Sequence, residues 1–229
     1  LAALREGAEQ PAPAFLREAK RDVIRNCIFG VDINPLAVEL CKVALWLEAH
    51  NPGEPLNFLD HHIKTGNSVV GLAHKEDLLQ GVPSAAFNTL PDDDKTTAQS
   101  FKKNNNKERK QEATGQIRTS RMLEENWKKA LSALAKIGRM PETTPDEIRA
   151  KKKAYTHLTQ RTNLIWNLRI LADAITAQFF IPKQPQLTKA LCSHNHIRDA
   201  LAGQHLHPLQ KAQAELQAQQ HSFFHWFAE

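Results

Sequence analysis

The sequence has few cysteines and no long apolar run. Its three cysteines, Cys27, Cys41 and Cys192, are too few and too widely spaced for a disulfide framework or a CxxC metal or redox site. No apolar run approaches the roughly 18 residues that cross a bilayer, and no signal-peptide pattern opens the chain. We therefore expect a soluble, unexported protein in the reducing cytoplasm, with no membrane partner.

Glycine is scarce outside one segment, since five of the nine glycines lie between residues 30 and 81. Turns that need glycine are therefore concentrated early, and the remainder of the chain is typical of helices. Of the 229 residues, 41% are hydrophobic, which is enough for a packed core. The chain has room for one large domain or two small ones.

A strand, a turn and a helix are predicted in the glycine-rich segment. Residues 27–31 (CIFGV) are typical of a short buried strand. Asn34 and Pro35 predict a helix start, in which Asn34 caps the helix and Pro35 takes its first position. A second short strand is expected at residues 62–65. These elements in this order form the building block of a parallel α/β sheet.

The later part of the chain predicts a linker followed by helices. Residues 102–111 (KKNNNKERKQ) are polar and of low complexity, which favours a flexible linker. Beyond it, apolar residues recur at helical spacing, including one long helix from about Thr144 to Phe180. We expect a partial α/β core over 1–82, a flexible linker over 83–115 and a helical insertion over 116–229. The predicted fold class is mainly α with a small α/β part.

Two polar residues follow the predicted strands directly. Ligands of doubly wound α/β folds bind at the carboxyl ends of the strands, where an acidic residue receives ribose hydroxyls. Asp32 has this position after the first strand, and Asn67 has a comparable one after the second. A carboxylate accepts hydrogen bonds from a ribose diol, and an amide offers adenine both a donor and an acceptor. The alternative is that Asp32 and Asn34 only shape a turn and cap a helix.

Three motifs occur in order along this segment: CIFGVDINPLAVELCK at 27–42, FLDH at 58–61 and GNSVVG at 66–71. Together they resemble the adenine-specific DNA methyltransferases of the Type IIG restriction-modification and BREX kind. The resemblance implies a partial Rossmann-like methyltransferase core that uses S-adenosylmethionine. It also implies methyl transfer to adenine N6 in DNA, in restriction-modification or phage defence.

The same resemblance assigns roles to four residues. It implies that Asp32 binds the ribose of S-adenosylmethionine, that Ile33 packs on its adenine and that Asn67 contacts the adenine edge. Asp60 either joins this cofactor site or holds its own loop together.

Two motifs of these methyltransferases are missing from the sequence. One is the glycine-rich cofactor loop of the DPxCGSG type, expected before residue 20. The other is the catalytic NPPY or NPPW, expected shortly after Glu229. Residues 168–180 are similar to a helix that precedes the catalytic motif, and residues 225–229 are similar to the lead-in to the catalytic strand. We expect an internal fragment, inactive in isolation, whose partners are DNA and the rest of the same polypeptide. The alternative is a non-catalytic helical DNA- or protein-interaction module on a degenerate methyltransferase scaffold.

Basic residues are concentrated in the middle of the chain. The whole chain has a formal charge of +5, whereas residues 101–155 alone have a net charge of +8. The predicted DNA contacts are Lys102, Lys103, Lys107, Arg109, Lys110 and the run Lys151, Lys152 and Lys153, because clustered basic residues meet phosphates without reading sequence. The alternative is a solvated helix face and a flexible loop.

Histidines are concentrated near the end of the chain. His221 and His225 are one helical turn apart, but no glutamate stands between them as in the HExxH motif. We expect no metal site there, and histidines that are solvated or packed against aromatic rings.

Overall fold

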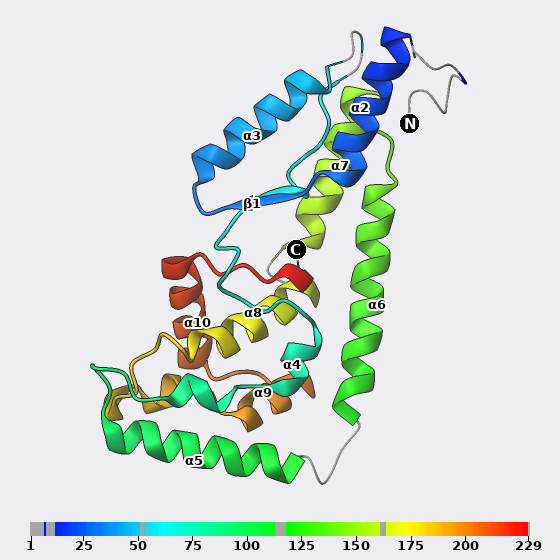
Figure 1. Ribbon diagram of the computed structural model, residues 1–229. Coiled ribbons are helices and arrows are strands. Elements are labelled where there is room, and N and C mark those ends of the chain that lie inside the picture. The colour runs from blue at the N-terminus through cyan, green and yellow to red at the C-terminus, as the bar shows by residue number, and fades with distance from the viewer. Residues whose placement is uncertain are drawn as a thin grey trace. The chain divides into compact units, whose positions relative to one another are not determined.

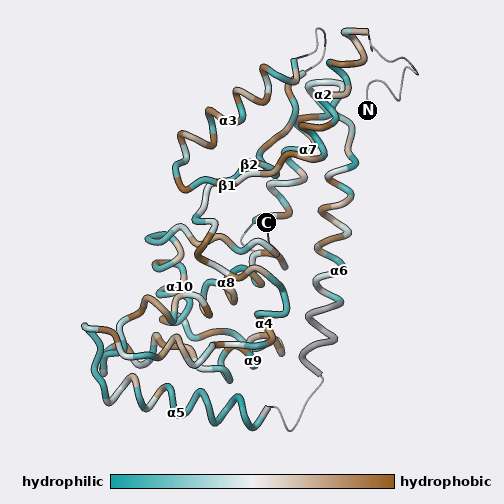
Figure 2. Tube along the Cα trace, in the orientation of Figure 1, coloured by the Kyte–Doolittle hydropathy of each residue, from teal (hydrophilic) through white to brown (hydrophobic). Residues whose placement is uncertain are grey.

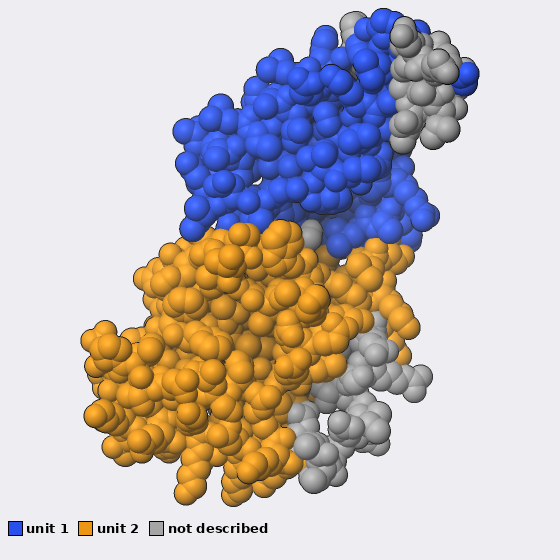
Figure 3. Space-filling view, viewed as in Figure 1, with its two compact units in different colours: residues 1–66, 133–158 blue, residues 67–132, 159–229 orange. Residues whose placement is uncertain are grey.

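The computed structural model describes residues 12–50, 55–112, 118–160 and 164–228, together with Gly7 and Gly53. The chain is mostly helical and has a small parallel sheet (Figure 1), which confirms the coarse prediction of a mainly α protein with a small α/β part. It divides into two compact units (Figure 3). The first unit is Leu1–Gly66 with Ala133–Leu158, and the second is Asn67–Ser132 with Thr159–Glu229.

The first unit is built around strands β1 and β2. Its elements are α2 (Pro13–Cys27), β1 (Gly30–Asp32), α3 (Pro35–Glu48), β2 (Ile63–Thr65), the end of α6 (Arg118–Gly138) and α7 (Pro145–Leu158). The two strands are parallel, with Gly30 opposite Ile63 and Asp32 opposite Thr65. The two predicted strands and the helix between them are therefore present.

Helix α3 covers the sheet with one narrow side. Val38 is buried with Ile24, Leu59 and Ile63 in a small apolar core. A second apolar row on α3, which we call the α3 stripe, consists of Leu36, Leu40, Val43 and Leu47. Each of its members is 45–74% exposed, and α3 alternates between apolar and polar colours in Figure 2. Apolar residues at this helical spacing normally face a core, so the α3 stripe is an unusual surface.

The second unit is helical and has its core along α8. Its elements are α4 (Glu76–Gln80), the short 3-10 helix η1 (Ser84–Phe87), α5 (Lys95–Glu112), the start of α6, α8 (Leu164–Ala177), η2 (Pro185–Ala190), α9 (His194–Leu201), α10 (Pro208–His221) and η3 (Trp226–Ala228). Helix α8 packs along α10. Ala172, Ala174 and Ile175 of α8 are at most 1% exposed, because they pack in the main apolar core.

The predicted flexible linker over 83–115 is largely wrong, because most of it folds as η1 and α5; residues 113–117 lie outside the described residues. Asn105 anchors α5 in the second unit. Its side chain is fully buried, donates from Nδ2 to the Val82 carbonyl at 2.9 Å and accepts from the His194 N–H at 2.8 Å. Helices are normally predicted from apolar residues at regular spacing. Here an asparagine whose amide nitrogen and oxygen are both hydrogen-bonded takes a buried position that an apolar side chain would normally occupy.

Two further expectations differ from the structure. The predicted helix from Thr144 to Phe180 is two helices, since α7 ends at Leu158 in the first unit and α8 begins at Leu164 in the second. The boundary expected at residue 82 falls at Gly66, because the chain after Gly66 packs with the C-terminal segment.

No helix in the described ranges is long and apolar enough to span a membrane.

Candidate functional site

Asp32 ends β1 and shapes the turn into α3. Its backbone carbonyl accepts a hydrogen bond from the Gly66 N–H at 2.9 Å, and its Oδ1 accepts one from the Asn34 N–H at 2.7 Å. Asn34 then caps α3 by accepting from the Leu36 N–H at 2.9 Å. The predicted turn and cap are thus both present. Asp32 is exposed, and its Oδ2 has no hydrogen-bond partner within the described residues, so one carboxylate oxygen is available to a ligand.

Ile33 lies on the same turn, directly after Asp32. Its side chain is 57% exposed, although β-branched apolar residues are usually buried. The turn therefore presents a carboxylate oxygen and an apolar surface side by side in the sequence. This pair of properties suits a ligand that has a polar diol next to a planar ring.

Asp60 is held by a lysine of α3. The Nζ of Lys42 lies 2.8 Å from Asp60 Oδ1 and 2.8 Å from Glu39 Oε1. Burial lowers the pKa of Lys42, but its hydrogen bonds to Asp60 and Glu39 outweigh burial, so the net effect is a raised pKa. Lys42 is therefore charged and joins the FLDH loop to α3. This contact supports the reading in which Asp60 holds its loop together.

Asn67 is the first residue of the second unit. Its N–H donates to the Ser222 carbonyl at 2.6 Å, and its Oδ1 accepts from the Val69 N–H at 3.2 Å. Its Nδ2 makes no hydrogen bond to any described residue. The structure therefore brings Asp32 and Ile33 together on one turn, whereas Asn67 belongs to the other compact unit.

The GNSVVG loop pairs with the segment that follows α10. Asn67 and Phe223 form an isolated parallel bridge, and the Phe224 N–H donates to the Val70 carbonyl at 2.9 Å. The indole Nε1 of Trp226 donates to the Ser68 carbonyl at 3.0 Å. The sequence resembled known motifs in each segment separately. Only the structure shows that the predicted lead-in to the catalytic strand lies against the predicted cofactor loop.

His225 holds the end of this pairing in place, a structural role that the sequence did not predict. It is fully buried; its Nδ1 accepts from the Leu72 N–H at 2.9 Å, and its Nε2 lies 2.8 Å from Asp173 Oδ1. Because Nδ1 accepts, Nε2 carries the proton and donates it to the carboxylate. No local pattern could reveal this pair, since Asp173 lies on α8, far from His225 in the sequence. Beside it, Gly71 has a positive φ of 155° and lies against Phe224.

His221, the other candidate metal ligand, stacks on Phe180 with ring centroids 4.1 Å apart. It is therefore packed against an aromatic ring, as the sequence suggested for histidines in this part of the chain. Across the described residues, no group of three or more histidine, cysteine or acidic side chains is arranged to hold a metal ion.

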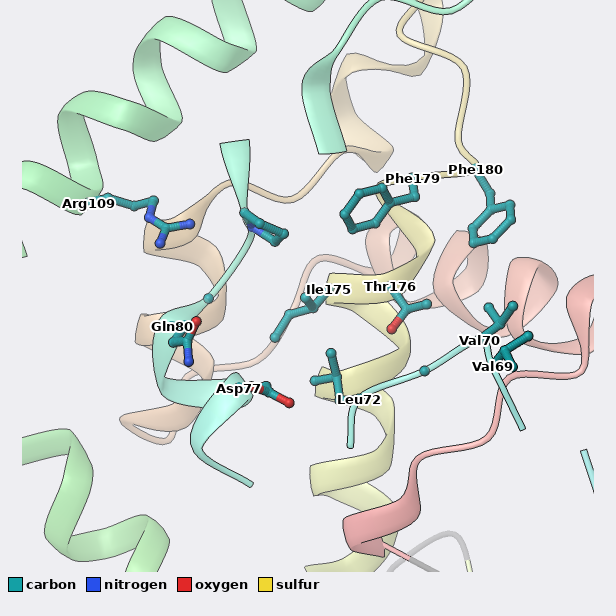
Figure 4. A pocket seen from close by; sticks show the side chains of 13 residues that line it. Val69, Val70, Leu72, Asp77, Gln80, Arg109, Ile175, Thr176, Phe179 and Phe180 are labelled. Carbon is teal, nitrogen blue, oxygen red and sulfur yellow. The ribbon is translucent and has the colours of Figure 1, made fainter. Parts of the chain in front are cut away.

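A cleft of about 400 Å³ lies in the second unit beside the GNSVVG loop (Figure 4). Val70 and Leu72 of the loop region, Ile175 of α8 and Phe179 just after α8 make much of its wall apolar. The Oγ1 of Thr176 is buried there and has no hydrogen-bond partner among the described residues. The cleft thus combines apolar walls with one unsatisfied hydroxyl, which suits a small amphipathic molecule or ordered water.

The structure corrects one of the predicted DNA contacts. Lys151 is only 1% exposed, and its Nζ lies 2.5 Å from Oε1 of Glu142, which is also buried. A buried ammonium held by a carboxylate cannot reach a DNA phosphate, so the assignment of Lys151 was wrong. Lys152 and Lys153 are exposed on α7 and stay predicted DNA contacts.

Comparison with known proteins adds one match. A family model described as Eco57I restriction-modification methylase matches residues 26–164, which is more than half of the chain. The matched region contains Asp32, Ile33, Asp60 and Asn67. No curated protein and no solved structure shows significant similarity to the chain.

Proposed function

The chain belongs to the Eco57I restriction-modification methylase family, and on this premise we propose that it is part of an enzyme that methylates adenine N6 in DNA. The methyl donor is S-adenosylmethionine, and the parent enzyme is of the Type IIG or BREX-like kind. It acts in the cytoplasm, in restriction-modification or phage defence. The resemblance of the DINP, FLDH and GNSVVG motifs to adenine-specific enzymes supports the choice of adenine.

Asp32 carries the proposal for the cofactor. It stands at the carboxyl end of the first of two parallel strands, which is where open α/β sheets bind nucleotide-like ligands. The Asn34 N–H fixes Oδ1 and so orients the carboxylate, while Oδ2 has no partner in the described structure. Oδ2 can therefore accept a hydrogen bond from a ribose hydroxyl. The carboxylate fits a ribose, because at neutral pH it only accepts hydrogen bonds and the ribose hydroxyls can donate them.

The other predicted cofactor residues have separate tasks. Ile33 offers its exposed side chain to the adenine ring, and the unbonded Nδ2 of Asn67 donates to the adenine edge. Asp60 acts indirectly, because its carboxylate holds Lys42 and thereby the FLDH loop. When bound, S-adenosylmethionine supplies an activated methyl group. The residues of this chain bind and orient that donor.

The proposal includes a further part of the methyltransferase as a partner. The α3 stripe leaves four large apolar side chains exposed on one helix of a cofactor-binding unit. Burying such a stripe stabilises a fold by roughly 25 cal/mol per Å² of apolar surface. We propose that additional α/β polypeptide of the same enzyme packs against the α3 stripe and extends the sheet into a Rossmann-like core.

We also expect this chain to be inactive by itself. Methyl transfer requires groups that orient the amine of the flipped adenine, and the sequence contains no NPPY or NPPW tetrapeptide for that task. Incubation of the 229-residue chain with labelled S-adenosylmethionine and DNA should give no labelled DNA. Labelling of DNA by the chain alone would contradict this expectation.

Calorimetry of the intact methyltransferase with S-adenosylmethionine tests the role of Asp32. The sharpest variant is Asp32→Asn, which keeps an oxygen for the Asn34 N–H but removes the charge and one acceptor. We expect affinity to fall about tenfold or more, in line with the loss of a charged hydrogen bond worth about 1.5–3 kcal/mol.

Asn34→Ala is the matched control, because it removes the cap of α3 and leaves the Asp32 carboxylate in place. It should lower stability with a smaller effect on cofactor affinity. Unchanged affinity in Asp32→Asn would remove Asp32 from the cofactor site.

A further inference from the structure

Helix α5 has two chemically different sides. The inner side packs on the second unit through Ala98, Phe101, Asn105 and Glu108. Ala98 is fully buried, and the ring of Phe101 stacks on Phe87 with centroids 5.9 Å apart. Glu108 accepts a hydrogen bond from the Asn195 N–H at 2.9 Å. The inner side therefore fixes the rotation of α5 about its own axis.

The outer side of α5 carries lysines in a row. Lys103, Lys107 and Lys110 recur at intervals of four and three residues, so they share one face of the helix. All three are exposed, and none has a hydrogen bond or an ion pair with a described residue. Glu108, the nearest carboxylate in the sequence, is used on the inner side. Within the described part of the chain, no carboxylate neutralises these three lysines, so the outer face is positive.

Amide side chains stand among these lysines. Gln99, Asn104 and Asn106 line the same open hollow, of about 960 Å³, as the three lysines. Helix α5 is almost continuously hydrophilic in Figure 2. Amides donate hydrogen bonds to phosphate oxygens, and lysines add positive charge. No large apolar or aromatic side chain lines this hollow among the described residues, so stacking on bases is not the mode of binding that the face favours.

The arrangement works against the stability of the helix itself. Like charges three and four residues apart repel each other by a few tenths of a kcal/mol per pair, and asparagine is a poor helix former. A polyanion that lies along the face would remove the repulsion. The lysines are about 6 and 4.5 Å apart along the helix axis, at 1.5 Å per residue, which allows each to meet a separate phosphate.

We propose that the outer face of α5, through Lys103, Lys107 and Lys110, binds the phosphate backbone of duplex DNA without reading its sequence. This inference rests on the proposed function, in which DNA is the substrate. It places the main electrostatic contact on the second unit rather than on α7, where only Lys152 and Lys153 of the predicted run are exposed.

Titration of the full chain against a fluorescent duplex across a salt series tests the assignment. The variant is Lys103→Gln/Lys107→Gln/Lys110→Gln. The control, Lys136→Gln/Lys189→Gln/Lys211→Gln, removes the same number of exposed charges from other helices, at positions that are not predicted DNA contacts. Each phosphate contact contributes about 0.9 to the slope of log K against log salt. We expect the α5 variant to lose about 2–3 from this slope and to bind about 100-fold more weakly near 0.1 M salt.

The control should keep most of the wild-type slope, and circular dichroism should show both variants folded. An α5 variant with the wild-type slope, or a control that loses as much as the α5 variant, overturns the α5 assignment and leaves DNA as the proposed substrate. A wild-type chain with no salt-dependent affinity for duplex DNA overturns the α5 assignment and counts against DNA as the partner. Cofactor binding by the intact enzyme is measured separately and tests the proposed function independently.

Discussion

The Nε2 atom of His225 donates a hydrogen bond to the Asp173 carboxylate across 2.8 Å inside the second unit. Since Nδ1 of the same ring accepts from the Leu72 N–H, one imidazole joins three segments that are distant in the sequence. These are the end of the GNSVVG loop, helix α8 and the chain after α10. In the proposed methyltransferase, this contact holds the lead-in to the catalytic strand beside the loop that contains Asn67.

A double-mutant cycle should measure the strength of this contact. His225→Phe leaves a buried carboxylate without its donor, and Asp173→Ala leaves the imidazole N–H without its acceptor. We expect each single variant to lower the free energy of unfolding by about 2–4 kcal/mol, because buried polar groups are costly to leave unpaired. Urea unfolding of the two single variants and the double variant should give a coupling energy of about 1–3 kcal/mol. Additive effects would contradict the direct bond.

Gly71→Ala should disturb the same region through the backbone. A Cβ at Gly71 would collide with the Phe224 carbonyl oxygen, and the positive φ of 155° is unfavourable for any residue with a side chain. We expect a loss of about 2–4 kcal/mol in thermal or urea unfolding. Gly138→Ala is the control, since nothing lies within 4 Å of its added Cβ, and it should be neutral or slightly stabilising. Equal effects of the two substitutions would exclude the close approach to Phe224.

Lys151→Met should destabilise the first unit far more than Lys152→Met. Lys151 neutralises Glu142, a buried carboxylate whose other partners among the described residues are Arg25 at 3.6 Å and the Phe58 N–H at 3.3 Å. Removing one partner of a buried ion pair costs about 3–5 kcal/mol, whereas an exposed substitution changes stability by about 0.5 kcal/mol or less. Chemical denaturation distinguishes the two. Adding Glu142→Gln to Lys151→Met should recover part of the loss, and no recovery would argue against a dominant ion pair.

The stability of the first unit should fall as the pH is lowered below about 6.5. Burial, and then the charges of His62 and Lys151, lower the pKa of His61 to about 3. His61 therefore takes up a proton near pH 6.5 in the unfolded chain, but only near pH 3 in the folded chain. Between these two pH values, uptake of this proton by the unfolded chain lowers the free energy of unfolding by up to about 1.4 kcal/mol per pH unit.

The variant His61→Phe removes the titrating group and keeps a ring to stack on Phe58, whose centroid lies 5.2 Å from that of His61. Unfolding measured between about pH 6.5 and 4 should show a shallower pH dependence than the wild type. His62 also has a pKa lowered by burial, so part of the dependence should persist. Identical pH profiles in wild type and variant would mean that His61 is protonated in the folded state.

Local structure followed the sequence closely around β1 and α3. Asn34 caps the helix, Pro35 takes its first position, and the strand before them ends at Asp32, because these preferences depend on neighbouring residues only. The family resemblance was also local, since its motifs are short and contiguous, and the matched family agrees with it at the level of restriction-modification methylases.

The prediction failed where a polar side chain is buried by a distant partner. Asn105 lies in a stretch whose composition is typical of a linker, yet its bonds to Val82 and His194 make it the anchor of a helix. The apolar row of α3 is the opposite case. Its spacing is typical of a buried face, but the described residues leave Leu40 and Leu47 exposed.

By itself, the sequence determined the strand, turn and helix that present Asp32, and the motifs that identify the family, because both depend on residues that are close together in the chain. Only the tertiary structure decided which lysines face solvent and which are neutralised inside. Lys103 and Lys151 look alike in the sequence, and they differ because Lys151 is buried against the carboxylate of Glu142, whereas Lys103 is exposed and has no ion pair with a described residue. The same holds for His225, whose partner Asp173 is brought to it by the packing of α8.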